Sequence, residues 1–433
     1  MKLSKIHLII IGGAILVILV LVLILGAKPK PEKNPYNITA SLKFWTYDSS
    51  KELYKEAIKT FTTLYPNVSF EQRNFTDPNE YEQAVIAALA SGQGPDIFMV
   101  KNTTLPKTAS LIFPIPAQGL SLASLRQFFP QIVEKNFYLN GQTYGLPLSI
   151  DTLALIYNRD IFNQNAIVSP PKNWEEFLKL IPILKKTDAN GKIIQAAAAI
   201  GGSQKSINEA SDLLTALMLQ TGTQMVDPSF SSATFASDEG LNALNFYLQF
   251  AQLNNPNYTW DDYFSNNSLN AFSQGKVAII FDYASSLSYL KTQNPFLNIG
   301  IGPLPQPTQA KKNITLARYW AYTVSRQTHY PQLAWKFILT LTTNPDIAKK
   351  YLEQSQKPPA LNSLINQYLN DPLLSTFSQQ VLFASSWPQK DDKQTREIFS
   401  QMIEMVNSGR LEPKEALTQA QDQITRLMAQ TSF

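Results

Sequence analysis

The chain has 433 residues, of which 44% are hydrophobic and only 16% charged, and its formal net charge is +4. This length exceeds one ordinary hydrophobic core and, at roughly 100 to 200 residues per domain, predicts two domains. The charged fraction lies below the usual share of about 25%, so uncharged polar side chains must cover much of the surface. No long run of Lys or Arg occurs, which argues against a nucleic-acid partner.

The residue inventory excludes several kinds of active site. The chain has no cysteine, which removes thiol nucleophiles, thiolate metal sites, iron–sulfur clusters and disulfides. Its two histidines, His7 and His329, lie in unrelated contexts, so they build neither a His-paired nucleophile nor a multi-histidine metal site. No acidic cluster has the spacing of a calcium or magnesium loop. We therefore expect no metal, no cofactor and no catalytic residue.

The chain begins with an apolar segment and a proline-rich linker. Residues 8–27 are almost purely aliphatic, about the twenty residues that cross a hydrocarbon layer roughly 30 Å thick. Lys2 and Lys5 precede the segment and favour an extracytoplasmic remainder, although lysines also follow it. A cleaved signal peptide is the alternative, but the sequence LGAKP at 25–29 matches its cleavage site poorly. We expect a single-pass membrane anchor at 8–27 and a tether at 28–39.

Residues 42–100 predict a βαβαβ unit. Leu42 and Phe44 alternate on a first strand, and later apolar strands at 68–70 and 97–100 follow amphipathic helices. In sheets of this kind ligands bind outside the carboxyl ends of the strands, at a topological switch point. The pattern therefore predicts a ligand cleft where these strands end.

The rest of the chain also predicts an α/β protein. Strands are expected at 153–157, 277–281 and 299–301, and helices at 174–184, 213–220 and 241–253. From residue 332 onward the chain is predicted to be nearly all helix.

This order of landmarks resembles the extracellular solute-binding proteins of ABC importers, specifically the sugar-binding family that includes maltodextrin-binding proteins. The resemblance spans about 42–428 and rests on seven short motifs in family order. They are FxxLYP at 61–66, SGQGPDI at 91–97, YGLP at 144–147 with LIYNRDIF at 155–162, PKNWEEF at 171–177, FSQGKVAI at 272–279, GPLP at 302–305 and SGRLxxxEAL at 408–417.

The resemblance implies an α/β, two-lobed periplasmic-binding-protein-like fold with mostly parallel sheets and a hinge. Lobe 1 would hold 40–149 and 303–324, and lobe 2 would hold 150–302 and 325–433. The chain would cross between the lobes near 149–152, near Gly302 and near Ser325. A ligand would bind between the lobes, and hinge bending would close them. The implied function is delivery of a carbohydrate or another small polar solute to the permease subunits of an ABC importer, by a membrane-tethered monomer.

Twelve residues are candidates for ligand contact: Trp45, Tyr47, Asp48, Lys101, Asn102, Asp151, Asp282, Tyr283, Arg318, Tyr319, Trp320 and Trp387. Aromatic rings stack on the C–H faces of a sugar, and carboxylates accept hydrogen bonds from its hydroxyls. Residues 45–48 and 101–102 follow strand ends, and Asp151 matches the family's acidic ligand-binding position. The alternatives are that Trp45 belongs to the core, that Asp48 caps the next helix, and that Asp151 bonds within the hinge.

The other candidates depart from the family pattern or extend it. Many relatives have Gly-x-Trp where this chain has FDYAS at 281–285, so Asp282 and Tyr283 are candidate replacements. Arg318, followed by two aromatic residues, would pair with an anionic ligand or lie along an aromatic face. Trp387 occupies a bend at which relatives contact ligand, and a packing role is its alternative.

Two other functions stay open at this point. A carbohydrate-acting enzyme needs two carboxylates about 5 to 9.5 Å apart, and Asp48 and Asp151 would face one another across the hinge. A sensory or adhesion module would use the same lobes to signal to a membrane partner. The sequence marks no acid/base pair, so a non-catalytic receptor is the favoured interpretation.

Overall fold

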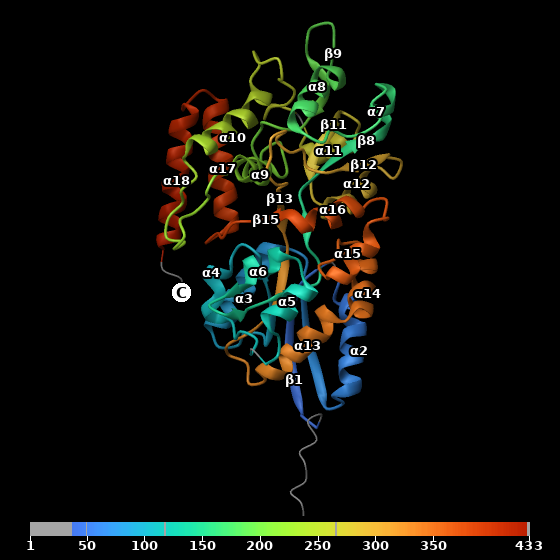
Figure 1. The fold of residues 1–433 in the computed structure, drawn as a ribbon, viewed down its shortest axis with the longest axis vertical. Coiled ribbons are helices and arrows are strands. Elements are labelled where there is room, and N and C mark those ends of the chain that lie inside the picture. The colour runs from blue at the N-terminus through green and yellow to red at the C-terminus, as the bar shows by residue number, and fades with distance from the viewer. Residues whose placement is uncertain (1–36, 49, 117, 265, 431–433) are drawn as a thin grey trace, which may run out of the picture.

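A computed structural model describes residues 37–48, 50–116, 118–264 and 266–430. Two lobes follow one another along the long axis of the molecule, and the strands β13 and β15 lie between them (Figure 1). Within the described ranges, no helix combines the length and the apolar character needed to cross a membrane. The expected anchor at 8–27 lies outside these ranges.

Lobe 1 is built on a five-stranded sheet in the order β2-β1-β3-β14-β6. Its strands are β1 (Ala40–Tyr47), β2 (Val68–Phe75), β3 (Ile97–Lys101), β14 (Trp320–Val324) and β6 (Leu146–Pro147). Strand β1 pairs in parallel with β2 and β3, whereas β14 runs antiparallel to β3 and β6. The helices α2 (Lys55–Leu64) and α3 (Pro78–Ala90) connect the parallel strands. The predicted βαβαβ unit is therefore confirmed, and its switch point lies between β1 and β3.

Lobe 2 is built on a second five-stranded sheet, in the order β12-β8-β11-β10-β9. Its strands are β12 (Ile299–Gly302), β8 (Ala154–Asn158), β11 (Val277–Asp282), β10 (Ile193–Ala198) and β9 (Lys186–Thr187). Only β10 and β11 pair in parallel. The expectation of mostly parallel sheets is wrong for this lobe. A strand buried on both faces, such as β11, has the same continuous apolar pattern in either direction, so the sequence does not reveal its partner's orientation.

The remaining helices and short strands surround these sheets (Figure 1). Lobe 1 contains η1 (Lys51–Tyr54), α4 (Leu105–Thr108), η2 (Ala109–Leu111), α5 (Leu122–Phe128), α6 (Gln131–Phe137), β4 (Tyr138–Leu139), β5 (Gln142–Thr143), α13 (Pro331–Thr343), α14 (Pro345–Ser355) and α15 (Asn362–Tyr368). Lobe 2 contains α7 (Arg159–Gln164), α8 (Trp174–Leu184), α9 (Ala210–Thr221), α10 (Asp238–Leu248), η3 (Gln249–Ala251), α11 (Ser268–Ser273), η4 (Ala284–Ser286), α12 (Leu287–Gln293), α17 (Asp392–Asn407) and α18 (Pro413–Ala429). Between the lobes lie β7 (Asp151–Thr152), β13 (Thr315–Arg318), α16 (Ser375–Gln380), η5 (Val381–Phe383) and β15 (Ala384–Ser385).

Two apolar cores define the lobes, and they differ from the expected boundaries. Side chains from Leu304 to Leu316 belong to the core of lobe 2, whereas those from Leu333 to Ile365 belong to the core of lobe 1. The chain therefore crosses near 316–317 and after 365, and not near Gly302 and Ser325. The cause is the apolar face of α13, whose Phe337 ring lies 5.4 Å from that of Phe44 on β1. Motif order alone does not show on which side of a crossing a helix packs.

A three-stranded sheet in the order β15-β13-β7 joins the lobes. Ala317 pairs with Thr152, and Arg318 pairs with Asp151, in antiparallel register. The pairing brings two charged residues that are 167 positions apart in the chain to the same place between the lobes. Ile150 belongs to the core of lobe 1 and Leu153 to the core of lobe 2, so the chain passes from one core to the other between them.

Candidate functional site

A cavity of about 880 Å³ lies between the lobes. Its walls come from the carboxyl ends of β1 and β3 in lobe 1, from the start of α12 in lobe 2, and from the crossing strands. The lining residues are Tyr47, Asp48, Thr76, Pro78, Met99, Lys101, Leu148, Ser149, Asp151, Ala284, Ser285, Leu287, Ser288, Lys291, 318–320, Tyr322, 351–357, Tyr368, Asp371, Leu373 and Leu374. The switch-point argument therefore predicted the position of the cavity.

The structure brings seven of the twelve candidate residues to this cavity and leaves five outside it. The seven that line it are Tyr47, Asp48, Lys101, Asp151, Arg318, Tyr319 and Trp320. The five that do not are Trp45, Asn102, Asp282, Tyr283 and Trp387.

The aromatic corner of the cavity consists of Tyr47, at the end of β1, and Trp320, at the start of β14. Their ring centroids lie 5.3 Å apart, and the rings of Tyr81 and Trp320 meet edge to face with centroids 5.5 Å apart. Both Tyr47 and Trp320 are only half-buried, so each offers ring surface to the cavity. Sequence reasoning missed Tyr81, which supports the corner from α3.

Lys101 connects this corner to lobe 2. Its ammonium lies 5.4 Å from the Trp320 ring centroid and donates a 2.7 Å hydrogen bond to Asp392 at the start of α17. The Gln389 N–H, on the same segment, donates to the Thr103 carbonyl at 2.7 Å. The end of β3 is therefore tied to lobe 2 by an ion pair and a backbone bond.

Several candidate residues are engaged in packing. Trp45 packs against Phe75, with the Arg73 guanidinium 4.7 Å from its ring centroid. Trp387 is only 3% exposed and stacks on Phe399. The Asn102 side chain accepts from the Tyr319 N–H and donates to the Ala317 carbonyl. For Trp45 and Trp387, the structure matches the packing alternative that the sequence left open.

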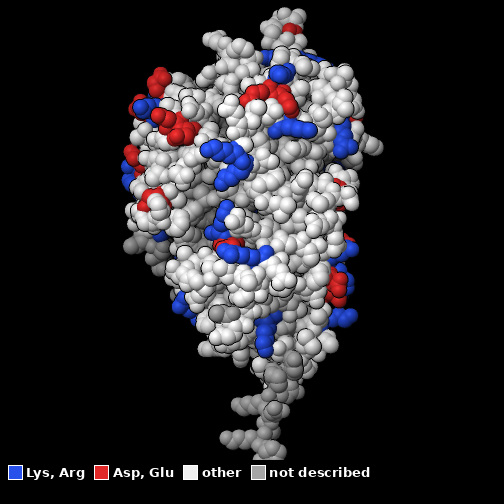
Figure 2. Space-filling view, in the orientation of Figure 1, with Lys and Arg blue, Asp and Glu red and all other residues white. Residues whose placement is uncertain are grey.

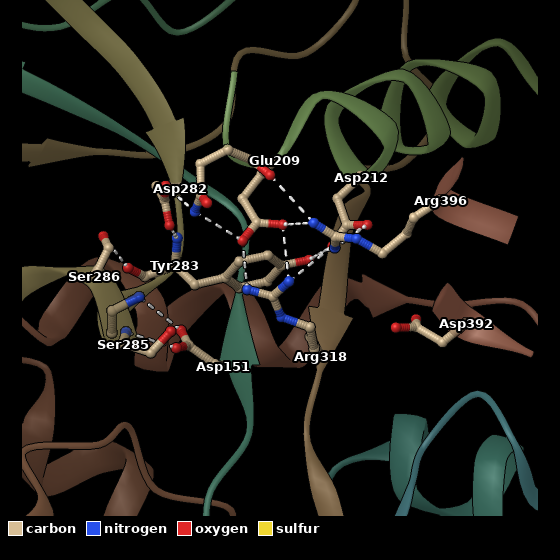
Figure 3. Close-up of polar contacts among 12 residues, drawn as sticks. Asp151, Glu209, Asp212, Asp282, Tyr283, Ser285, Ser286, Arg318, Asp392 and Arg396 are labelled. Atoms are coloured by element: carbon tan, nitrogen blue, oxygen red, sulfur yellow. Dashed lines mark hydrogen bonds and ion pairs between the residues drawn. The ribbon is translucent and has the colours of Figure 1, made fainter. Parts of the chain in front are cut away.

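Arg318 lies in a cluster of buried charges at the floor of the cavity (Figure 3). Its guanidinium donates two hydrogen bonds to Glu209, at 2.8 and 2.7 Å, and lies 3.9 Å from the Tyr283 ring centroid. Arg396 bonds both Glu209, at 2.9 Å, and Asp212, at 3.2 Å, and the Tyr283 hydroxyl donates to Asp212. Of the two alternatives that the sequence left open for Arg318, the structure matches the one in which it lies along an aromatic face. Because its fork is occupied by Glu209, Arg318 is already neutralised within the protein.

Within this cluster the two arginines compensate for the burial of Glu209. Burial raises the pKa of Glu209, but the adjacent Arg318 and Arg396 charges outweigh that effect and hold this pKa below its ordinary value. No local pattern in the sequence indicates the cluster, since its members come from the start of α9, from β13 and from α17, which are distant in the chain.

Asp151 is a backbone-capping residue between the lobes. Its carboxylate accepts from the N–H groups of Ala284 and Ser285, each at 3.0 Å, and from its neighbour Thr152 at 2.9 Å. Burial raises the pKa of Asp151 to about 6, and these backbone bonds oppose the rise. The structure thus supplies the hinge hydrogen bonds that were the alternative to ligand contact, while one edge of the residue still lines the cavity.

Asp48 is fully engaged inside lobe 1. Its carboxylate accepts from the hydroxyls of Tyr54 and Tyr351 and from the Lys357 ammonium, the last at 2.7 Å. Its side chain is completely shielded from solvent. Sequence reasoning missed Tyr351 and Lys357, which it had assigned to lobe 2. The available signal was the polar run EQSQK at 353–357 before Pro358 and Pro359, which marks a helix end.

No group of three or more His, Asp or Glu side chains in the described residues is arranged to hold a metal ion. On the face seen in Figure 2, charged side chains are scattered over a mostly uncharged surface. This agrees with the low charged fraction of the sequence, and several Lys and Arg side chains lie toward the middle of that face, beside a few acidic ones.

Comparison with known proteins identifies the family. The family model for bacterial extracellular solute-binding proteins matches residues 47–348. The maltotriose-binding protein of Pyrococcus abyssi is 23% identical over 344 residues, which cover 78% of this chain and 70% of that protein. The multiple sugar-binding protein of Streptococcus mutans is 21% identical over 282 residues, covering 60% of this chain and 63% of that protein.

Solved structures share the fold. The sugar-binding protein MalE from Xanthomonas citri superposes with a TM-score of 0.76 at 18% identity, covering 90% of this chain and 97% of that one. A solute-binding protein from Thermotoga lettingae, bound with α-D-tagatose, gives a TM-score of 0.70 at 22% identity and covers 90% of this chain and 100% of its own. These likenesses confirm the expected α/β two-lobed fold.

The buried carboxyl of Asp282 should make the free energy of unfolding depend on pH. Burial, then the nearby Glu209 charge, raises the pKa of Asp282 to about 7 from an ordinary 3.8. The folded chain therefore holds this proton more tightly than the unfolded chain, and stability falls as pH rises between those values. Asp282→Asn removes this contribution, so we expect the variant to be more stable than the parent at about pH 8, by up to about 4 kcal/mol, and to show a flatter pH profile.

Urea unfolding across about pH 4 to 8 measures the effect. Asp238→Asn is the matched control, because Asp238 is an exposed acid in the first turn of α10. Equal pH profiles for the parent and Asp282→Asn would contradict the prediction.

Proposed function

The chain belongs to the bacterial extracellular solute-binding protein family, and we propose that it captures an uncharged carbohydrate between its lobes and delivers it to an ABC importer. The proposal is supported by relatives named for maltotriose, lactose and multiple sugars, and by structural neighbours bound to sugars. Hinge bending about the crossing strands closes the lobes on the ligand.

The observation that carries the proposal is the combination of an aromatic corner with internally neutralised charges. Lys101 pairs with Asp392, Arg318 with Glu209, and Lys357 with Asp48. The acids Asp151 and Asp371 accept backbone N–H groups of the protein. A charged solute bound beside these groups would have to displace one of their partners and leave it unpaired, at high cost. The other charged lining residues, Lys291 and Glu353, are exposed to solvent. An uncharged, hydroxyl-rich ligand with apolar ring faces requires no such displacement.

The arrangement of the acids favours a receptor over a hydrolase. Glycoside hydrolysis requires a pair of carboxyl groups that flank the scissile bond. Asp48 is shielded from solvent and bonded by Tyr54, Tyr351 and Lys357. Asp151 is bonded by three backbone N–H groups. Both acids therefore act as fixed acceptors within the protein.

We also propose that residues 8–27 keep the receptor at the membrane, with 28–39 as the tether. The support is the length and apolar character of the segment. N-terminal sequencing of protein from native membranes tests this. A mature terminus between Gly26 and Asn37 would show that the segment is removed.

The proposed function is tested by calorimetric titration of the region from residue 37 onward with maltotriose, lactose, mannobiose and tagatose. At least one sugar is expected to bind with a dissociation constant of about 1 μM or below, a free energy of about −8 kcal/mol. Small-angle scattering should then show a smaller radius of gyration as the hinge closes. Binding of amino acids or organic anions, with no response to any sugar, would overturn the proposal.

Substitutions of Trp320, in the aromatic corner, and of Trp387, outside the cavity, should have different effects on sugar binding. Trp320→Ala should weaken sugar binding by roughly thirtyfold, since loss of a central aromatic anchor costs about 2 kcal/mol or more. Trp387→Ala should lower thermal stability by removing a buried ring, yet leave the sugar affinity nearly unchanged, because Trp387 lies outside the cavity. The opposite pattern of affinity losses would place the sugar against Trp387 instead.

A further inference from the structure

The turn that follows α14 forms part of the cavity wall. Every residue from 351 to 357 lines the cavity. Helix α14 ends at Ser355, and Gln356 has φ 53° and ψ 38°, a left-handed conformation that side chains with a Cβ adopt at a cost. Three residues beyond Lys357, the Ala360 N–H donates to the Leu148 carbonyl at 3.1 Å. The strained turn is thus fixed on both sides.

The position of Lys357 is set by Asp48. The Lys357 ammonium donates to the Asp48 carboxylate at 2.7 Å and to the Tyr351 hydroxyl at 3.2 Å. An ammonium group carries three N–H donors, so one is left beyond these two bonds. The Lys357 side chain is 30% exposed and lines the cavity, whereas that of Asp48 is fully buried.

Three tyrosines keep the Asp48 carboxylate in place. Tyr54 and Tyr351 donate to one of its oxygens, and the Tyr322 and Tyr54 hydroxyls lie 2.8 Å apart. Burial, with the Asp48 charge as a further cause, raises the pKa of all three tyrosines well above 10, so they stay protonated. The Asp48–Lys357 pair has no net charge, so it favours an uncharged acceptor over an anion.

We propose that Lys357 is a specificity-determining residue of the cleft, which donates a hydrogen bond to a hydroxyl or ring oxygen of the bound solute. Asp48 is the positioning residue that holds it. The assignment rests on the proposed function and deepens it, because it names the protein donor and the class of ligand atom. Asp48, which the sequence suggested as a ligand acceptor, contacts Lys357 and not the ligand in this assignment.

The first test is Lys357→Met, titrated with the sugar that the parent binds best. The expected loss of affinity is roughly tenfold to a hundredfold, as for other hydrogen bonds to a charged group. Lys350→Met is the matched control. It makes the same change seven residues earlier, on α14 itself, at an exposed residue whose partner is Glu56, and it should leave the affinity within about twofold. Parent-like binding by Lys357→Met would overturn the proposal.

The single variant leaves the buried Asp48 without its counter-charge, which by itself destabilises the fold. The double variant Asp48→Asn/Lys357→Met removes both charges and should recover stability without recovering affinity. A series of monodeoxy analogues of the bound sugar then separates direct contact from a structural role. Loss of one hydroxyl should weaken binding to the parent and have no effect on the double variant. Equal effects of every analogue on both proteins would overturn direct contact.

Different results would refute the proposed function and the assignment of Lys357 as a donor. If the parent binds no sugar of the panel, the proposed function is wrong, and crystals grown with glycerol then test the donor with a small uncharged polyol. A glycerol oxygen within hydrogen-bond distance of the Lys357 ammonium supports the assignment. A cleft in which glycerol is bound elsewhere, or not at all, overturns it.

Discussion

The pairing of Arg318 with Asp151 across β13 and β7 is the constraint on which the cleft depends. Both residues lie on crossing strands, and both extend into lobe 2. Asp151 accepts the N–H groups at the start of η4, and Arg318 forms a bidentate bond with Glu209 beside α9. Removing one member of the Arg318–Glu209 ion pair would leave a buried charge without its partner, which costs about 3 to 5 kcal/mol. The floor between the lobes is therefore a rigid unit about which both lobes can bend.

Neutralisation of charge is the second organising feature of the site. The cationic groups of Lys101, Arg318 and Lys357 each have a carboxylate partner from another part of the chain. The partners differ in what they connect. Lys101 joins lobe 1 to lobe 2, Arg318 joins the floor to lobe 2, and Lys357 joins the end of β1 to the turn after α14. The same ion pairs that hold the walls in position also neutralise these three cations, so the shape and the electrostatics of this part of the cleft are linked.

The sequence revealed the parts of the site that depend on local pattern. The strand–helix alternation from 42 to 100 predicted the parallel unit and its switch point, and Tyr47 and Lys101 do line the cavity there. The sequence did not reveal which polar side chains would find their hydrogen-bond and ion-pair partners within the protein. Asp48 and Lys357 are 309 residues apart, and their contact exists only because α14 packs in lobe 1. Tyr283 similarly follows a strand end, as expected, but α9 supplies Asp212 for its hydroxyl and so turns it away from the cavity.

The division of the cavity wall between the lobes determines how ligand binding can drive closure. A ligand shifts a conformational equilibrium only by its difference in affinity for the two states. A sugar that touched only the aromatic corner of Tyr47 and Trp320 would bind the open and closed forms equally, since both rings belong to lobe 1. Ser285 and Ser288, at the start of the η4–α12 segment in lobe 2, line the opposite wall and offer hydroxyls to the same cavity. Closure is therefore favoured by those hydrogen bonds that a ligand already stacked in lobe 1 gains from lobe 2.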